Sequence, residues 1–77
     1  MNKLSFPNIE NVSIFFHRYT RRDGLKLRGT ATVEGQKATF RTHVVLERVL
    51  DFYCQATSKF IKSVQLTEQQ YLDLINN

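Results

Sequence analysis

The stretch from Leu25 to His43 alternates between two kinds of residue with a period of two, and this alternation constrains the fold more than any other feature. One set of positions is small or apolar: Leu25, Leu27, Gly29, Ala31, Val33, Ala38, Phe40, Thr42 and Val44. The other set is cationic or hydroxylated: Lys26, Arg28, Thr30, Thr32, Lys37, Thr39, Arg41 and His43. Gly35 between the two runs tolerates the positive φ of a tight turn. The pattern predicts a β-hairpin with one apolar side and one cationic side.

A further strand is expected from Val12 to Thr20, which is rich in β-branched and aromatic residues. Alternation assigns Val12, Ile14, Phe16 and Arg18 to one side and Ser13, Phe15, His17 and Tyr19 to the other. If the first set joins the core, Phe15, His17 and Tyr19 share the cationic side. The opposite register would expose Ile14 and Phe16. Asp23-Gly24 is a turn signal, so residues 12–43 are predicted to form a three-stranded antiparallel meander.

The period then changes, and residues 44–64 are predicted to form an amphipathic helix. Its apolar stripe comprises Leu46, Val49, Leu50, Tyr53, Ala56, Phe60 and Val64. Thr67 and Gln70 are spaced as a capping box, which predicts a short second helix over residues 67–76. Residues 1–11 are read as an extended arm over a core edge, in which Leu4 to Phe6 could add an edge strand. The expected fold is α+β, with a three-stranded antiparallel sheet covered on one face by the long helix.

Length and cysteine content limit the class of protein. With 77 residues the chain fits one domain, 1–77, which is too small for a deep catalytic cleft. Cys54 is the single cysteine, and the opening residues lack the apolar core of a signal peptide, so a cytoplasmic protein is expected. No run reaches the ~18 apolar residues of a membrane span, so no membrane partner is expected.

No combination of residues predicts an enzyme or a cofactor site. A phosphate-cradling glycine loop, paired cysteines and metal-binding histidine spacing are all missing from the sequence. His17 and His43 could approach each other across strands, but two histidines without a third ligand make a poor metal site. Cys54 is expected to be a small buried hydrophobe rather than a nucleophile. We therefore expect no catalytic residues, no metal and no cofactor.

The charge distribution points instead to an anionic partner. The net charge is +4, and residues 1–43 hold eight Lys and Arg against three Asp and Glu. Arginine and lysine neutralise phosphates, threonine hydroxyls bind phosphate oxygens, and exposed rings can stack on bases. The predicted nucleic-acid-binding residues are Phe15, His17, Tyr19, Arg21, Arg22, Lys26, Arg28, Thr30, Lys37, Thr39, Arg41 and His43. Arg28 and Arg41 are the candidates for guanine edges, with DNA favoured over RNA.

Several segments resemble the arm-binding N-terminal domain of tyrosine-type integrases. The similar segments are Tyr19–Gly24, Leu27–Val33, Glu34–Lys37 and Phe40–Thr42, followed by the expected helix. The resemblance implies a three-stranded sheet that enters the DNA major groove. It also implies DNA contacts from Arg21, Arg22, Lys26, Arg28, Lys37 and Arg41.

A protein-binding role is the alternative. A small accessory or inhibitor protein of the phage or mobile-element type could use the same basic face on an acidic protein. The stripe of Tyr71, Leu72, Leu74 and Ile75 could also join two copies of the chain.

Overall fold

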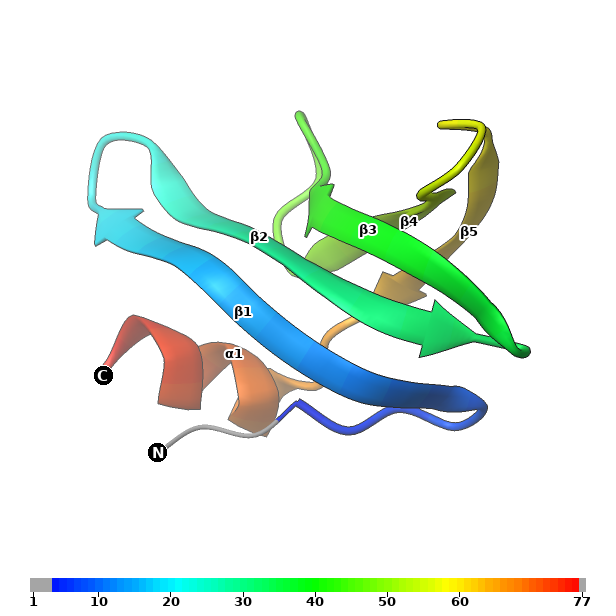
Figure 1. Ribbon diagram of the computed structural model, residues 1–77. Helices are drawn as coiled ribbons and strands as arrows, with labels where there is room; N and C mark the ends of the chain where they lie inside the picture. The colour runs from blue at the N-terminus through cyan, green and yellow to red at the C-terminus, as the bar shows by residue number, and fades with distance from the viewer. Residues whose placement is uncertain (1–3, 77) are drawn as a thin grey trace.

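A computed structural model describes residues 4–76, which form one curled antiparallel sheet and one short helix (Figure 1). The strands are β1 (Ile9–Thr20), β2 (Gly24–Val33), β3 (Gln36–Thr42), β4 (Val49–Cys54) and β5 (Phe60–Gln65). They pair in sequence order, β1-β2-β3-β4-β5. The helix α1 (Glu68–Ile75) follows β5 and lies beneath β1 in the view of Figure 1. The α+β class is therefore confirmed, but the sheet has five strands rather than three.

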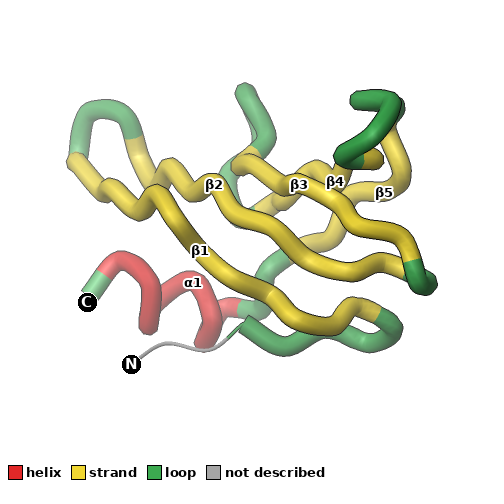
Figure 2. Tube along the Cα trace, in the orientation of Figure 1, coloured by secondary structure: helices red, strands yellow, loops and turns green. Residues whose placement is uncertain are grey.

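The predicted helix over residues 44–64 is wrong. Residues 43–48 form a loop, and β4 and β5 follow it as a second hairpin (Figure 2). Each pairs along its length, β4 with β3 and β5 with β4. Leu50 and Phe52 are buried on the core side, and Asp51 is buried on the outer face between its strand neighbours Arg41 and Ser63. A strand buried in this way has no clear alternation, so its apolar residues can match a helical spacing by chance.

The β2–β3 hairpin forms with the two sides that the sequence predicts. Ala31 pairs with Ala38 and Gly29 with Phe40 on the buried side, while Thr30 pairs with Thr39 on the other. The turn between the strands has positive φ at Glu34 and Gly35. We call the side that carries Arg28, Thr30, Thr39 and Arg41 the outer face.

Two irregularities in β1 change which of its side chains reach the outer face. The register with β2 shifts once between Glu10 and Ser13 and again between Ile14 and Phe16. Each shift inserts one extra residue, and residues beyond a bulge change sides relative to simple alternation. Phe16 pairs with Arg28 on the outer face, whereas His17 pairs with Leu27 on the core side. The predicted sides of Phe16, Arg18, His17 and Tyr19 are therefore wrong.

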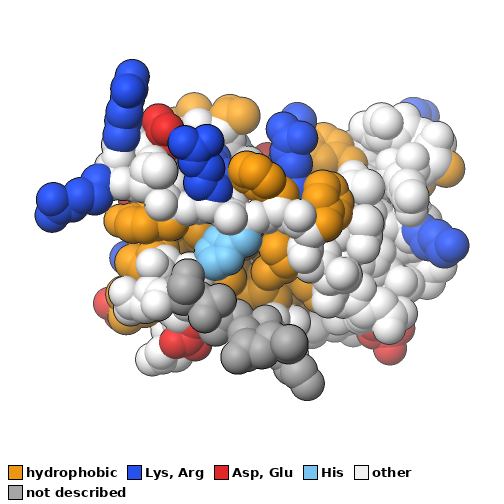
Figure 3. Space-filling view, turned by 60° about the vertical axis from the view of Figure 1, so that its left-hand side comes forward, with side chains coloured by type: hydrophobic (Ala, Val, Ile, Leu, Met, Phe, Trp, Pro, Cys, Tyr) orange, Lys and Arg blue, Asp and Glu red, His pale blue; other side chains and the backbone are white. Residues whose placement is uncertain are grey.

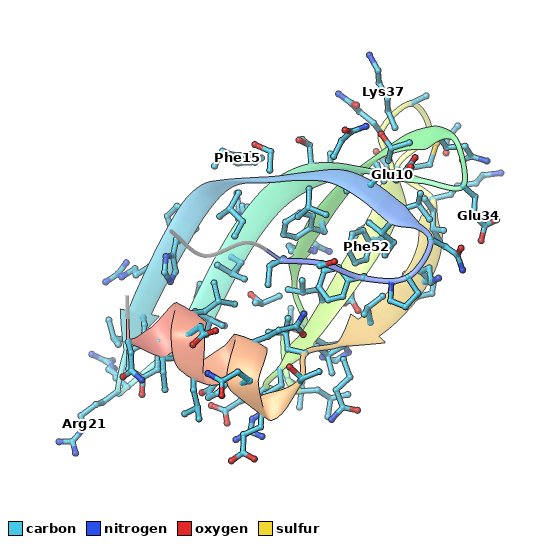
Figure 4. All side chains as sticks on the ribbon, turned by 90° about the horizontal axis from the view of Figure 1, so that it is seen from below. Glu10, Phe15, Arg21, Glu34, Lys37 and Phe52 are labelled. Carbon is cyan, nitrogen blue, oxygen red and sulfur yellow. The ribbon has the colours of Figure 1, made fainter. Side chains whose placement is uncertain are left out.

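The core lies between the curled sheet, α1 and the N-terminal segment. Phe52 is fully buried, and its ring packs against Phe40 and edge-on against Phe6. Figure 4 shows Phe52 inside the fold, with Phe15 and Lys37 pointing outward from the sheet. Leu4 and Phe6 are buried, and Phe6 forms an isolated bridge with Ile9. The N-terminal arm thus covers the core as expected, while residues 1–3 lie outside the described part.

The capping box that begins α1 is confirmed. The Thr67 hydroxyl accepts from the Gln70 amide at 3.1 Å, and the Gln70 side chain accepts from the Thr67 amide at 2.9 Å. Tyr71 and Leu74 are buried in the core, so two of the four residues proposed for self-association are occupied within the chain. The His17 Nε2–H donates to the Leu74 carbonyl at 2.8 Å, which ties the end of α1 to β1.

The Tyr71 phenol makes the stability of the fold sensitive to alkaline pH. Burial raises its pKa, Glu47 and Tyr19 raise it further, and the Arg48 guanidinium, 4.6 Å above the ring, lowers it. The unfolded chain loses this proton at a lower pH than the folded chain. The contribution of Tyr71 to the free energy of unfolding is therefore fully present below about pH 10 and is lost as the pH rises further. Urea unfolding of the wild type should show this alkaline loss. Tyr71→Phe should reduce this loss, and an equal loss in the wild type and in Tyr71→Phe would contradict the assignment.

Candidate nucleic-acid interface

Residues that face each other across antiparallel strands point to the same side of a sheet, so the register places the side chains of the outer face in rows. One row crosses all five strands as Phe16, Arg28, Arg41, Asp51 and Ser63. A neighbouring row comprises Ser13, Thr30, Thr39, Tyr53 and Phe60. With strands spaced at about 4.8 Å, the face is about 19 Å wide from β1 to β5.

Cations are placed directly opposite one another on this face. Arg28 on β2 pairs with Arg41 on β3, and Arg18 on β1 pairs with Lys26 on β2. Arg28 and Arg41 are exposed, and Lys26 is half-buried. Like charges directly opposite each other destabilise a sheet, so the Arg18–Lys26 pair is unfavourable for folding alone, whereas the Arg28–Arg41 repulsion is offset in part by Asp51, which lies opposite Arg41 on β4. Their presence on one face is typical of a surface that binds an anion.

Arg41 is also part of a stack that extends to the edge strand. Its guanidinium lies 5.0 Å from the centre of the Tyr53 ring and donates to the Tyr53 hydroxyl at 3.4 Å. The Tyr53 ring in turn meets the Phe60 ring edge-on at 5.7 Å. The Asp51 carboxylate beside Arg41 is buried and accepts a 2.6 Å bond from the Ser63 hydroxyl. The contacts with Tyr53 thus hold the Arg41 guanidinium over the Tyr53 ring.

The bulge in β1 adds two more rings to the outer face. Phe15 is 68% exposed and Phe16 42% exposed, although both are large apolar side chains. A shallow hollow of about 330 Å³ lies between Phe15 and Tyr53, with Arg28, Thr39, Arg41 and Ser58 also at its border. A second hollow of about 340 Å³ lies beside Phe16 and shares Arg28 and Arg41. Figure 3 shows basic side chains standing among hydrophobic ones on the upper part of the face it presents.

The structure brings most of the predicted binding residues together. The outer face holds Phe15, Lys26, Arg28, Thr30, Lys37, Thr39 and Arg41. Arg21 and Arg22 are exposed in the turn between β1 and β2. His17 and Tyr19 do not belong to the face, since they lie on the core side of β1. Among the residues the structure describes, no three His, Cys, Asp or Glu side chains are grouped as metal ligands.

His43 has a local role instead of a place on the outer face. Its Nδ1 accepts from the backbone amides of Val45 and Leu46, each at 3.0 Å. These bonds shape the β3–β4 loop, whose tip presents Val44, Val45 and Leu46 to solvent. Val44 and Val45 are each 78% exposed, more than any other large hydrophobic side chain among the described residues.

Four residues of the face were missed by sequence reasoning, namely Phe16, Arg18, Tyr53 and Phe60. Phe16 and Arg18 were assigned to the opposite side because nothing in the residues marks the second bulge. Tyr53 and Phe60 were placed on the buried stripe of a helix, yet Phe60 is 57% exposed. The signal that could have located them is the pair of β-rich segments 49–54 and 60–65, separated by polar turn residues.

Cys54 lies at the end of β4, half-buried rather than in the core. Hydrogen bonds from the Thr57 hydroxyl, and then from the backbone of Thr57 and Ala56, lower the pKa of its thiol. These bonds belong to the β4–β5 turn, where the Ser58 amide donates to the Cys54 carbonyl at 2.7 Å.

No protein-family model matches this chain, and comparison with curated proteins and with solved structures finds no match either. The resemblance to integrase arm-binding domains therefore stays a hypothesis. The helix that it implied after the third strand is replaced by β4 and β5. Over residues 4–76 the structure has no helix long and apolar enough to cross a membrane.

Proposed function

We propose that this protein binds nucleic acid, with DNA favoured, through the outer face of its sheet. The observation that carries the proposal is the pair of opposed cations, Arg28 with Arg41 and Arg18 with Lys26. An anionic ligand removes the repulsion within each pair, so these positions gain more from binding a phosphate chain than isolated surface cations do.

The neighbouring side chains support a phosphate ligand. Thr30 and Thr39 face each other between the two strands and can donate hydroxyls to phosphate oxygens. Lys37 and the turn residues Arg21 and Arg22 extend the positive charge toward opposite ends of the sheet, as Figure 4 shows for Lys37 and Arg21. Arg28 keeps an exposed guanidinium, which can bind a phosphate or a guanine edge.

The test is binding of labelled single-stranded and duplex oligonucleotides across a salt series. Arg28→Ala with Arg41→Ala should weaken binding at least about tenfold and reduce the slope of log K against log salt by about 2. The double variant removes the repulsion between the two arginines but also the contacts of Arg41 with Tyr53, so the melting temperature should change only slightly.

A matched double variant, Lys59→Ala with Lys62→Ala, removes the same charge elsewhere. Lys59 lies in the β4–β5 turn, and Lys62 pairs with Phe52 on the other side of the sheet. This variant should keep most of the affinity. Equal losses in both double variants, or no binding even at about 50 mM salt, would overturn the proposal.

An acidic protein is the second candidate partner, favoured by the apolar loop tip of Val44, Val45 and Leu46. This tip borders the arginines of the β1–β2 turn, Arg21 and Arg22, in one surface hollow. Exposed apolar side chains beside cations fit a protein surface of complementary charge. Absence of oligonucleotide binding at low salt would leave this candidate standing.

A further inference from the structure

The outer face carries more exposed aromatic surface than phosphate binding requires. Phe15, Phe16 and Phe60 are each more than two-fifths exposed, and the Tyr53 ring lies beside Phe60. Single exposed apolar residues are common on protein surfaces, but here four rings share one face with the arginines. We infer that the face is a stacking platform for the bases of a single-stranded nucleic acid, an inference that rests on the proposed function.

The rings lie at the two ends of the arginine pair. Phe15 and Phe16 belong to β1, Tyr53 and Phe60 belong to β4 and β5, and the two arginines lie on the strands between. Three strand spacings separate the β1 and β4 backbones, or about 14 Å, and Phe15 and Tyr53 border the hollow that contains the two arginines from these two strands. The platform therefore offers stacking partners at both ends of the arginine pair, with the backbone of the bound strand passing over the arginines.

The side chains are already arranged as stacking partners. The Arg41 guanidinium over the Tyr53 ring and the Phe60 ring, inclined at 73° to it, hold the Tyr53 side chain in place. A ring held in one orientation loses little freedom when a base covers it. The hollow between Phe15 and Tyr53 and the one beside Phe16 have volumes of about 330 and 340 Å³, near the lower end for ligand sites.

A duplex does not satisfy this arrangement. Bases in a duplex are stacked on one another and present only their edges in the grooves, so the exposed rings would find no partner. In a single strand the base faces are free, and stacking on aromatic side chains tolerates any sequence. Substrate preference should therefore be for unpaired segments over duplex.

The experiment compares ligands that differ in their bases, their sugar or their strandedness. Fluorescence anisotropy would be measured with a thymidine strand of about 12 nucleotides, a uridine strand, a duplex, and an abasic strand of the same length and charge. The thymidine strand should bind at least about tenfold more tightly than both the abasic strand and the duplex. Tighter binding of the thymidine strand than of the uridine strand would support the preference for DNA, and equal or weaker binding would contradict that preference while leaving the stacking platform standing.

Variants then locate the stacking. Phe15→Ala and Phe60→Ala should each weaken binding of the thymidine strand by about 5- to 100-fold while leaving the salt slope unchanged. Phe15→Tyr and Phe60→Tyr should retain affinity, because a ring remains. Leu72→Ala removes an exposed apolar side chain from α1 and should have no effect.

The outcomes separate this inference from the function on which it rests. If the abasic strand or the duplex binds as tightly as the thymidine strand, the stacking platform is wrong, although nucleic-acid binding stands. If no oligonucleotide binds at about 50 mM salt, the proposed function itself is wrong. The comparison of ligands needs no variant, so it does not depend on whether a substituted chain folds.

Discussion

Replacing Phe52 with alanine should lower the free energy of unfolding by about 3–5 kcal/mol. Phe52 is fully buried in the core. Its ring centre lies 5.2 Å from that of Phe40 and 6.2 Å from that of Phe6, which it meets edge to face. Its loss leaves a cavity where a strand of the sheet meets the N-terminal segment. A 77-residue chain is expected to have a total stability of about 4–12 kcal/mol, so this single change removes a large part of it.

Phe60→Ala is the matched control, because it deletes the same side chain from the next strand where it is 57% exposed. It should cost about 1 kcal/mol or less, mainly through the contact with Tyr53. Chemical denaturation of both variants measures the difference, and Phe52→Leu provides a milder variant if Phe52→Ala does not fold. Similar losses for Phe52→Ala and Phe60→Ala would show that the core does not lie where the structure puts it.

The β2–β3 hairpin could be predicted from the sequence because each of its strands has one solvent-exposed side and one buried side. In such strands the alternation of side chains reports directly on the register, and Arg28 and Arg41 could be placed on one face from their positions alone. The helix α1 was also predictable, since the Thr67 capping box marks its first residue locally.

The second half was mispredicted for a physical reason. In β4, apolar residues occupy both sides of the strand, Leu50 and Phe52 toward the core and Val49 and Tyr53 toward the outer face, so the pattern of apolar residues carries no clear period of two. The β-branched and aromatic content of residues 49–54 and 60–65 was the remaining signal. The helical interpretation assigned Tyr53 and Phe60 to the core and thereby removed half of the candidate stacking surface.

The bulges of β1 are harder to predict because one extra residue leaves almost no trace in the sequence. Asn11, with φ of 54°, marks the first, since asparagine tolerates left-handed backbone better than most residues. The second, at Phe15, has no such marker. It nevertheless decides that Phe16 and Arg18 face outward and that His17 reaches the Leu74 carbonyl.

Gly29 permits the close approach of β1 to β2 at this second bulge, so Gly29→Ala should both destabilise the fold and weaken binding. A methyl group at this position would overlap the Ser13 carbonyl oxygen of β1 and the Phe40 ring in the core. The carbonyl is backbone and cannot rotate away, so β1 must move. We expect a loss of about 1–3 kcal/mol in the free energy of unfolding. Movement of β1 would also separate Phe15 and Phe16 from Arg28, which lowers affinity for single strands.

Thr30→Ala is the control for Gly29→Ala, because Thr30 is the next residue of β2 and points to the outer face, where no backbone is crowded. It should change stability by no more than about 0.5 kcal/mol. Urea unfolding would be measured on both variants, and anisotropy with the thymidine strand on Gly29→Ala and the wild type, because Thr30 is itself a candidate phosphate contact. A Gly29→Ala protein as stable as Thr30→Ala would show that β1 and β2 are not in contact at Ser13. A destabilised Gly29→Ala protein with unchanged affinity would show that the position of β1 does not matter for the ligand.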